Sequence, residues 1–209
     1  MKTNAVVITG DVIQSSLLDP KERGRLQKAL EQAFAVVKKK EKSFDVEQYR
    51  GDSFQAVITK NPGEALHFSL MLMAMLWKED FKARLAIGTG EISFNAKKIV
   101  TSDGPAFQNS GPYLDELKKK NGLISVVGPH PAVNQEWEVH CQSLSFIIER
   151  WSAPQAEAVL EQLNGLTQVQ AAEKLNIRQP AVHQRLQGAG WQVIQLVLRR
   201  FEQQAPSMF

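Results

Sequence analysis

Two aspartates, each directly after a glycine, lie next to strand-like segments of the chain. Asp11 follows an apolar, β-branched run, and Asp52 lies in a turn between two alternating runs. Two carboxylates on neighbouring strand ends are what a protein needs to hold Mg²⁺ or Mn²⁺ against the phosphates of a nucleotide. Because glycine has no Cβ, Gly10 and Gly51 let phosphate oxygens approach the backbone. The sequence therefore predicts a metal site at Asp11 and Asp52, with the two glycines in a nucleotide-binding surface.

The segments around these aspartates alternate between strand and helix patterns. Strands are predicted over residues 5–9, 44–49, 54–59, 83–87 and 123–127, and helices begin near residues 20, 64 and 105. This order, with a hairpin after the first helix, is that of a ferredoxin-like, split-βαβ fold of the α+β class. In this fold the first strand lies beside the hairpin, so we expect Asp11 and Asp52 to approach one another.

From Pro154 onward the sequence is helical and rich in glutamine, without a strand pattern. A helix capped by Thr167, the turn Asn176-Ile177 and a second helix are typical of a helix-turn-helix unit. Its outward residues are expected to contact DNA bases and phosphates: Arg178, Gln179, Pro180, His183, Gln184 and Arg185. We therefore expect an α/β domain over residues 1–145 and an all-α DNA-binding domain over residues 146–209. A helical unit for protein contacts is the alternative.

The bulk composition is that of a globular protein and only weakly basic. The chain has 25 Lys and Arg against 22 Asp and Glu, a net charge of +3, which is compatible with nucleic-acid or nucleotide binding but does not demand it. Cys141 is the single cysteine, so no intramolecular disulfide can form. The most apolar stretch, residues 66–77, is too short to cross a bilayer, and no secretory leader is recognisable. These features predict a cytoplasmic protein that does not enter a membrane.

Three segments resemble a known group of proteins. The hairpin 49–55 looks like the catalytic hairpin of nucleotidyl cyclases and GGDEF domains. Residues 84–91 are similar to the strand-and-turn signature of class III cyclases, and residues 103–107 stand where such cyclases place a glycine-led helix. Over nearly all of its length the chain resembles the SatD family. That resemblance implies a cyclase-like palm domain followed by a C-terminal helix-turn-helix.

The resemblance also implies roles for individual residues. Asp11 and Asp52 would be the metal carboxylates, and the backbone of Val12 and Ile13 would face the phosphates. Asn109 matches the asparagine with which cyclases stabilise the transition state.

Two departures from the cyclase pattern concern turnover. Ser53 stands where GGDEF domains carry a second acidic residue, and Tyr113 stands one helical turn after Asn109, where cyclases carry an arginine. An unneutralised phosphorane would raise the barrier by several kcal/mol.

The sequence thus favours a DNA-binding regulator whose palm binds a nucleotide and metal without efficient turnover. An active nucleotidyl cyclase or transferase and a protein-binding adaptor are the alternatives. A homodimer would suit both halves. The resemblance implies that cyclase sites form between two palms, and helix-turn-helix units often read paired half-sites.

Overall fold

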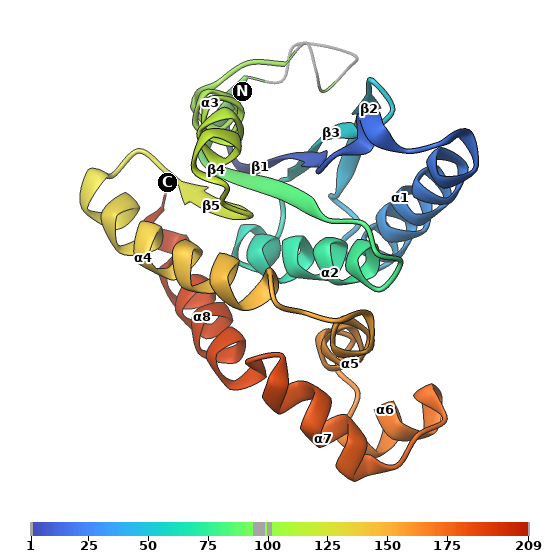
Figure 1. Ribbon diagram of the computed structural model, residues 1–209. Coiled ribbons are helices and arrows are strands. Elements are labelled where there is room, and N and C mark those ends of the chain that lie inside the picture. Colours follow the sequence, from blue (N-terminus) through green and yellow to red (C-terminus); the bar gives the residue numbers. More distant parts are fainter. Residues whose placement is uncertain (1, 94–98, 100–101, 209) are drawn as a thin grey trace.

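The computed structural model describes residues 2–93, 99 and 102–208, and it has an α+β architecture around one mixed sheet (Figure 1). The strand order is β2-β3-β1-β4-β5. These strands are β1 (Lys2–Val12), β2 (Asp45–Tyr49), β3 (Ser53–Ile58), β4 (Ala83–Ser93) and β5 (Ile124–Val127). β1 pairs antiparallel with both β3 and β4, and β5 joins β4 in parallel. The first four strands therefore form the split-βαβ arrangement, and β5 extends it.

Eight α-helices lie in the described part of the chain. They are α1 (Pro20–Lys40), α2 (Ala65–Trp77), α3 (Pro105–Lys120), α4 (Pro131–Ile148), α5 (Ala153–Leu163), α6 (Gln168–Leu175), α7 (Gln179–Gly188) and α8 (Trp191–Gln204). Capping boxes at Asp19, Ser152 and Thr167 fix the starts of α1, α5 and α6. None of these helices combines the length and apolar character that crossing a membrane requires.

The two faces of the sheet are covered unequally. α1 and α2 lie against one face, while α3 lies on the other, over β4 and its neighbours (Figure 1). α2 is buried almost all round because α1, α5 and the sheet surround it. Its sequence is correspondingly apolar on every side. The face under α3 carries the polar residues that matter for a site.

β1 and β4 are longer than the sequence predicts. They pair continuously from Lys2 opposite Ser93 to Val12 opposite Ala83, so Asp11 lies within β1 rather than after it. Gly88 does not end β4. A Cβ at this position would lie 2.2 Å from the backbone oxygen of Ala106, so the glycine is what allows α3 to pack closely on the strand.

α4 closes the sheet at its β5 side. The Ser145 hydroxyl accepts hydrogen bonds from the backbone N–H groups of Leu123 (3.1 Å) and Ile124 (3.4 Å). The Asn134 side chain exchanges two hydrogen bonds with the backbone of Gly128, at 2.8 and 2.9 Å. These contacts satisfy backbone groups that an edge strand would otherwise expose.

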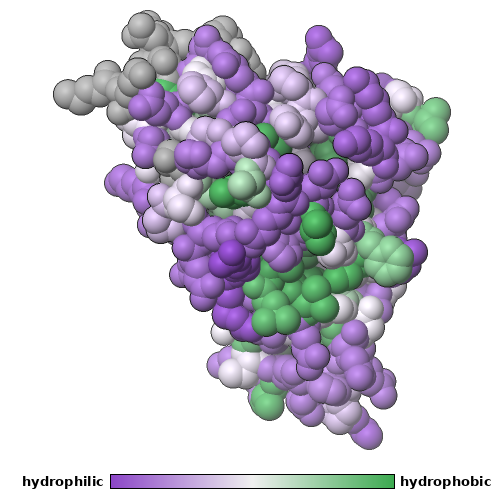
Figure 2. Space-filling view, turned by 90° about the vertical axis from the view of Figure 1, so that its left-hand side faces the viewer, coloured by the Kyte–Doolittle hydropathy of each residue, from purple (hydrophilic) through white to green (hydrophobic). Residues whose placement is uncertain are grey.

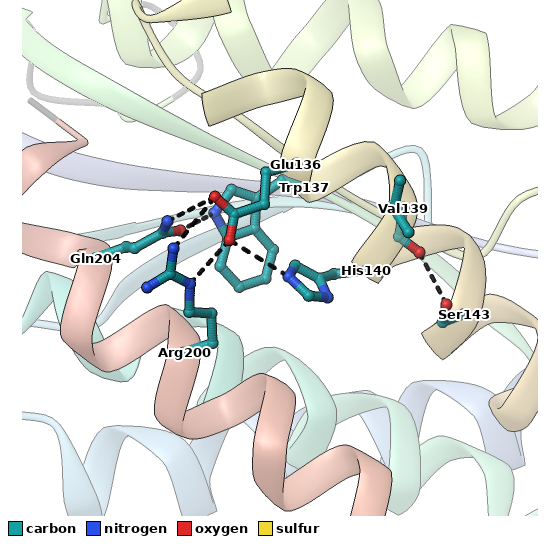
Figure 3. Close-up of polar contacts among 7 residues, drawn as sticks. All are labelled: Glu136, Trp137, Val139, His140, Ser143, Arg200 and Gln204. Carbon is teal, nitrogen blue, oxygen red and sulfur yellow. Dashed lines mark hydrogen bonds and ion pairs between the residues drawn. The ribbon is translucent and has the colours of Figure 1, made fainter. Parts of the chain in front are cut away.

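α4 also runs through the predicted domain boundary between residues 145 and 146 and binds α8. The Glu136 carboxylate accepts hydrogen bonds from Arg200 Nε (2.8 Å) and Gln204 Nε2 (2.8 Å) (Figure 3). Trp137 Nε1 donates to Gln204 Oε1 at 2.9 Å. One hydrophobic core contains residues of the sheet and of α8. The boundary itself stays a prediction.

Residues beyond α8 return to the sheet. The buried Thr89 hydroxyl on β4 donates a hydrogen bond to the backbone oxygen of Met208 at 2.7 Å. The Met208 side chain is buried as well. The segment after α8 thus ties the C-terminal helices to the sheet.

The Glu136 contact predicts a specific acid dependence of stability. Hydrogen bonds from Arg200 and Gln204 lower the pKa of Glu136 from 4.5 to about 2. Because the pKa of Glu136 is lower in the folded state, the ionised carboxylate stabilises the folded protein. This stabilisation is complete above pH 4.5 and is lost as the pH falls towards 2. Since the side chain is 35% exposed, we expect about 1 kcal/mol after solvent screening.

The measurement is urea denaturation of the wild type and Glu136→Gln between pH 7 and pH 2.5. The stability difference between them should shrink across this range. Glu138→Gln, on the same helix and facing Lys120 at 3.9 Å, is the matched control and should show no such trend. A difference that does not change with pH would contradict the assignment.

Candidate metal and nucleotide site

The structure brings Asp11 and Asp52 together at one end of the sheet. Asp11 lies directly opposite Ser53 in the β1–β3 register. The backbone N–H of Val12 donates to the backbone oxygen of Asp52 at 3.1 Å, which holds the hairpin turn against the end of β1. The split-βαβ topology is the reason, because it places β3 of the hairpin next to β1.

Asp11 is a buried carboxylate that is only half satisfied. The residue is 8% exposed, its Oδ2 lies 3.3 Å from Lys118 Nζ, and its Oδ1 has no hydrogen-bond partner. Arg84 lies directly opposite on β4, and its buried Nε likewise has no partner. Buried polar atoms are rarely left unpaired. An acceptor and a donor on adjacent strands therefore mark a place that a ligand can complete.

These unpaired atoms lie on the face of the sheet that α3 covers. Arg84 and Ala86 share a face of β4, and Ala86 packs with Leu114 and Leu117 of α3. The third unpaired buried atom of the described residues is Oγ of Ser125, which pairs with Ala86 across β4 and β5. All three unpaired atoms thus lie on one face.

Asp52 is held by two hydroxyls. Ser15, in a short 3₁₀ turn (Ser15–Leu17), donates a close hydrogen bond to Asp52 Oδ2, and Ser53 Oγ donates to Oδ1 at 3.2 Å. The preceding turn residues Arg50 (φ 57°) and Gly51 (φ 80°) are both left-handed. No atom lies within 4 Å of a Cβ placed on Gly51, so the space beside this residue is open.

Gly10 has a different environment from Gly51. A Cβ at Gly10 would lie 2.5 Å from the ring of Phe54 and 2.6 Å from the side chain of Leu85. Both side chains belong to the core beneath the sheet. The missing side chain of Gly10 thus makes room for the core on the face away from Asp11.

The backbone donors expected to face phosphates are engaged within the protein. Val12 N–H is bonded to Asp52, and Ile13 N–H donates to the backbone oxygen of Lys82 at 2.8 Å. Asn109 Nδ2 donates to the backbone oxygen of Thr89 at 2.9 Å. A phosphate would therefore have to displace an existing bond to reach any of these groups.

Tyr49, at the end of β2, senses the carboxylates of the site. Burial raises the pKa of the Tyr49 hydroxyl, and the charges of Asp11, Asp115 and Asp52 raise it further, while Arg50 opposes them. The raised pKa of Tyr49 therefore reports a half-buried hydroxyl with the site carboxylates nearby.

The residues present fit a metal ion that shares its ligands with a substrate. Among the described residues, no group of three or more His, Cys, Asp or Glu side chains converges, so a protein-only cage is excluded there. Mg²⁺ commonly takes one or two carboxylates and fills the rest of its shell with water and phosphate oxygens. Asp11, with its unpaired Oδ1, and Asp52 match that donor set.

Sequence reasoning missed Arg84, Lys118 and Ser15 as site residues. Lys118 belongs to a run of three lysines that is typical of a solvated helix end. Only the packing of α3 on β4 brings Lys118 to Asp11. Arg84 was visible as a charged residue in an otherwise apolar strand, which is the signal that could have found it.

The predicted DNA-contacting residues lie on and before α7. Arg178, Gln179, Pro180, His183 and Gln184 are exposed. Arg178 is the N-cap of α7 and makes no side-chain capping bond, as its residue type predicts.

Two of these side chains already have partners within the protein. Arg185 is half-buried and lies 3.3 Å from Glu157 of α5, so its charge is engaged. Gln179 Nε2 donates to Gln168 Oε1 at 2.8 Å.

A family model described as the SatD family matches residues 5–207. The chain belongs to the SatD family. The match includes β1 from Ala5 onward, the hairpin with Asp52 and helices α1 to α8, and it confirms the family predicted from the sequence. No curated protein matches this SatD-family chain.

Solved structures similar to this SatD-family protein include adenylyl and guanylyl cyclases. A bacterial light-regulated adenylyl cyclase is 14% identical, with 60% of this chain and 76% of that chain covered and a TM-score of 0.49. A dimeric guanylyl cyclase domain from the fungus Blastocladiella emersonii is 14% identical over 52% and 72% of the two chains, with a TM-score of 0.41. A guanylate cyclase domain from Catenaria anguillulae, in complex with GTP, is 14% identical. The match covers 52% of this chain and 71% of that chain, with a TM-score of 0.41. The fold of this chain follows from its own strand order and register.

Proposed function

We propose that this SatD-family protein binds a nucleoside phosphate together with Mg²⁺ or Mn²⁺ at Asp11 and Asp52. The observation that carries the proposal is the buried Asp11 carboxylate, whose Oδ1 has no partner and which lies between Lys118 and Arg84. When bound, the metal supplies positive charge to the phosphates. Arg84 is half-buried with an unpaired, buried Nε, and a guanidinium suits phosphate geometry.

Binding without efficient turnover fits the environment of α3. Tyr113, 41% exposed, has no positive charge to offer a developing phosphorane. Asn109 already donates to Thr89. Stabilisation of a developing oxyanion requires hydrogen-bond donors that point at it and have no other partner. The protein therefore acts as a nucleotide sensor rather than as a cyclase.

The test is calorimetric titration with ATP and GTP in the presence of Mn²⁺. Asp11→Asn removes the half-satisfied carboxylate and is expected to weaken binding at least about tenfold, roughly 1.4 kcal/mol. Asp45→Asn, at an exposed aspartate of β2 paired with Lys38, is the matched control and should bind as the wild type does.

Equal affinities for the wild type and Asp11→Asn would refute the proposal. Pyrophosphate released from either nucleotide by the wild type, and not by Asp11→Asn, would instead establish the cyclase or transferase alternative.

DNA binding by α6 and α7 as a helix-turn-helix is the second part of the proposed function. Support comes from the exposed polar face of α7, where His183 and Gln184 lie beside Arg178 at the helix start. A homodimer reading paired half-sites belongs to this proposal. Exposed apolar residues of α4 and α8 offer it a surface: Val139, Phe146, Val193 and Leu196. Figure 2 shows a cluster of apolar residues on the face that it presents.

The DNA proposal predicts a loss of affinity when α7 is altered. Sites selected from a random DNA pool should bind Gln184→Ala about tenfold more weakly, since one good base contact is worth about 1–3 kcal/mol. Gln192→Ala removes an exposed glutamine of α8 and should leave binding unchanged. Fluorescence anisotropy at fixed salt gives both values. If the pool yields no enriched sequence, the adaptor alternative is favoured.

A further inference from the structure

Lys118 forms an ion pair with the candidate metal ligand Asp11. It lies in the last turn of α3, and its Nζ is 3.3 Å from Asp11 Oδ2 and 3.8 Å from Asp115 Oδ1. The Lys118 side chain is 42% exposed, whereas Asp11 is buried. A buried carboxylate is thus neutralised by a lysine that reaches in from the surface.

The ion pair between Lys118 and Asp11 satisfies only one of the two carboxylate oxygens, as expected for a partner that can be replaced. A buried charge needs an opposite charge nearby, and Lys118 supplies one. An ammonium on a flexible four-carbon stem is a point charge that moves easily. It satisfies Oδ2 and leaves Oδ1 unpaired. A divalent cation at Asp11 would carry twice the charge and could use the unpaired oxygen.

We propose that Lys118 is a resident counter-ion that neutralises Asp11 while the metal is absent and must be displaced for a divalent cation to bind. The inference rests on the proposed metal site and adds its regulation. Asp115, one helical turn before Lys118 and exposed, is the partner to which the displaced ammonium can turn.

The consequence is coupling between metal and nucleotide. A metal ion that binds without a nucleotide must displace Lys118 from Asp11, so the loss of this ion pair offsets much of its binding free energy. A metal that arrives with a phosphate group brings the ammonium a new anion, so the displacement costs less. By linkage, each ligand then raises the affinity for the other by the same factor. The site therefore responds to the metal–nucleotide complex and discriminates against the free ion.

The experiment is titration of Mn²⁺ alone, without nucleotide, followed by the electron paramagnetic resonance signal of free Mn²⁺. Lys118→Met, which keeps the length of the side chain and removes its charge, is expected to bind Mn²⁺ at least tenfold more tightly than the wild type. Lys118→Arg keeps the charge and should bind no more tightly than the wild type. Lys119→Met, at an exposed neighbour paired with Glu116, is the control and should also match the wild type.

A second readout is thermal unfolding of the metal-free protein. Lys118→Met leaves Asp11 without its counter-ion, so its melting temperature should fall, and Mn²⁺ should raise it by more than it raises that of the wild type. Adding Asp11→Asn to Lys118→Met should abolish the gain in Mn²⁺ affinity.

The outcomes separate this inference from the nucleotide proposal. Equal Mn²⁺ affinities of the wild type and Lys118→Met, or no Mn²⁺ binding by Lys118→Met, would overturn the counter-ion role. Tighter Mn²⁺ binding by Lys118→Met, with no nucleotide bound by any variant, would support that role and refute only the nucleotide proposal.

Discussion

Replacement of Trp137 by alanine is expected to lower the free energy of unfolding by about 3–5 kcal/mol. Trp137 is fully buried on α4, and its ring lies 5.2 Å from that of Phe201 on α8 in an edge-to-face arrangement. Its indole N–H also donates to Gln204. Alanine would leave a cavity at the contact that joins α4 to α8, and the surrounding helices can close it only in part.

Urea denaturation of Trp137→Ala and Trp137→Phe separates packing from hydrogen bonding. Phenylalanine keeps an aromatic ring against Phe201 and removes the donor to Gln204. The lost hydrogen bond should lower the free energy of unfolding by about 1 kcal/mol, and the smaller ring volume lowers it further. Tyr113→Ala, at an exposed aromatic residue of α3, is the control and should change stability by less than about 1 kcal/mol. Comparable losses for Trp137→Ala and Tyr113→Ala would contradict the role assigned to Trp137.

The second large effect is expected for Gly88→Ala. A Cβ at Gly88 would lie 2.2 Å from Ala106 O and 2.6 Å from Ser110 N, both of which are backbone atoms of α3. A helix backbone cannot yield as a flexible side chain can, so α3 must move away from β4. Overpacking of this kind costs about 1–3 kcal/mol, and occasionally more. The same movement would draw Lys118 away from Asp11.

Gly24→Ala provides the matched control for this substitution. Gly24 lies within α1, and no atom lies within 4 Å of a Cβ placed on it, so alanine there should stabilise the protein by about 0.5–1 kcal/mol. Urea denaturation of both variants measures the two effects. If Gly88→Ala proved as stable as the wild type, the close approach of α3 to β4 would be refuted.

The central sheet and the meeting of the two aspartates could be predicted from the sequence. Alternating runs and turn residues gave the order of elements, and that order places Asp11 next to the hairpin of Asp52. The lengths of β1 and β4 could not be predicted in the same way. Gly88 is a turn residue by propensity, but it pairs with Val7 inside the sheet and allows the close approach of α3.

Other features depend on tertiary packing. The start of α4 is not evident from the sequence, because Gly128 and Pro129 indicate the end of a strand. Pro131 is the first residue of the helix, where proline is favoured. The contact of Lys118 with Asp11 depends on the depth at which α3 sits on the sheet. Arg185 was expected on the DNA-facing side because its type suits phosphate, but it pairs with Glu157.

The hydrogen bond between Thr89 and Met208 bears on how the protein forms during synthesis. The two residues are separated by 119 positions, and the bond ends at a buried strand in the middle of the sheet. While a ribosome is still making α8, the Thr89 hydroxyl has no Met208 to bind. The sheet that carries Asp11 therefore reaches its final state only after residue 208 has emerged, so nascent chains lacking that residue should be the ones that chaperones and proteases recognise.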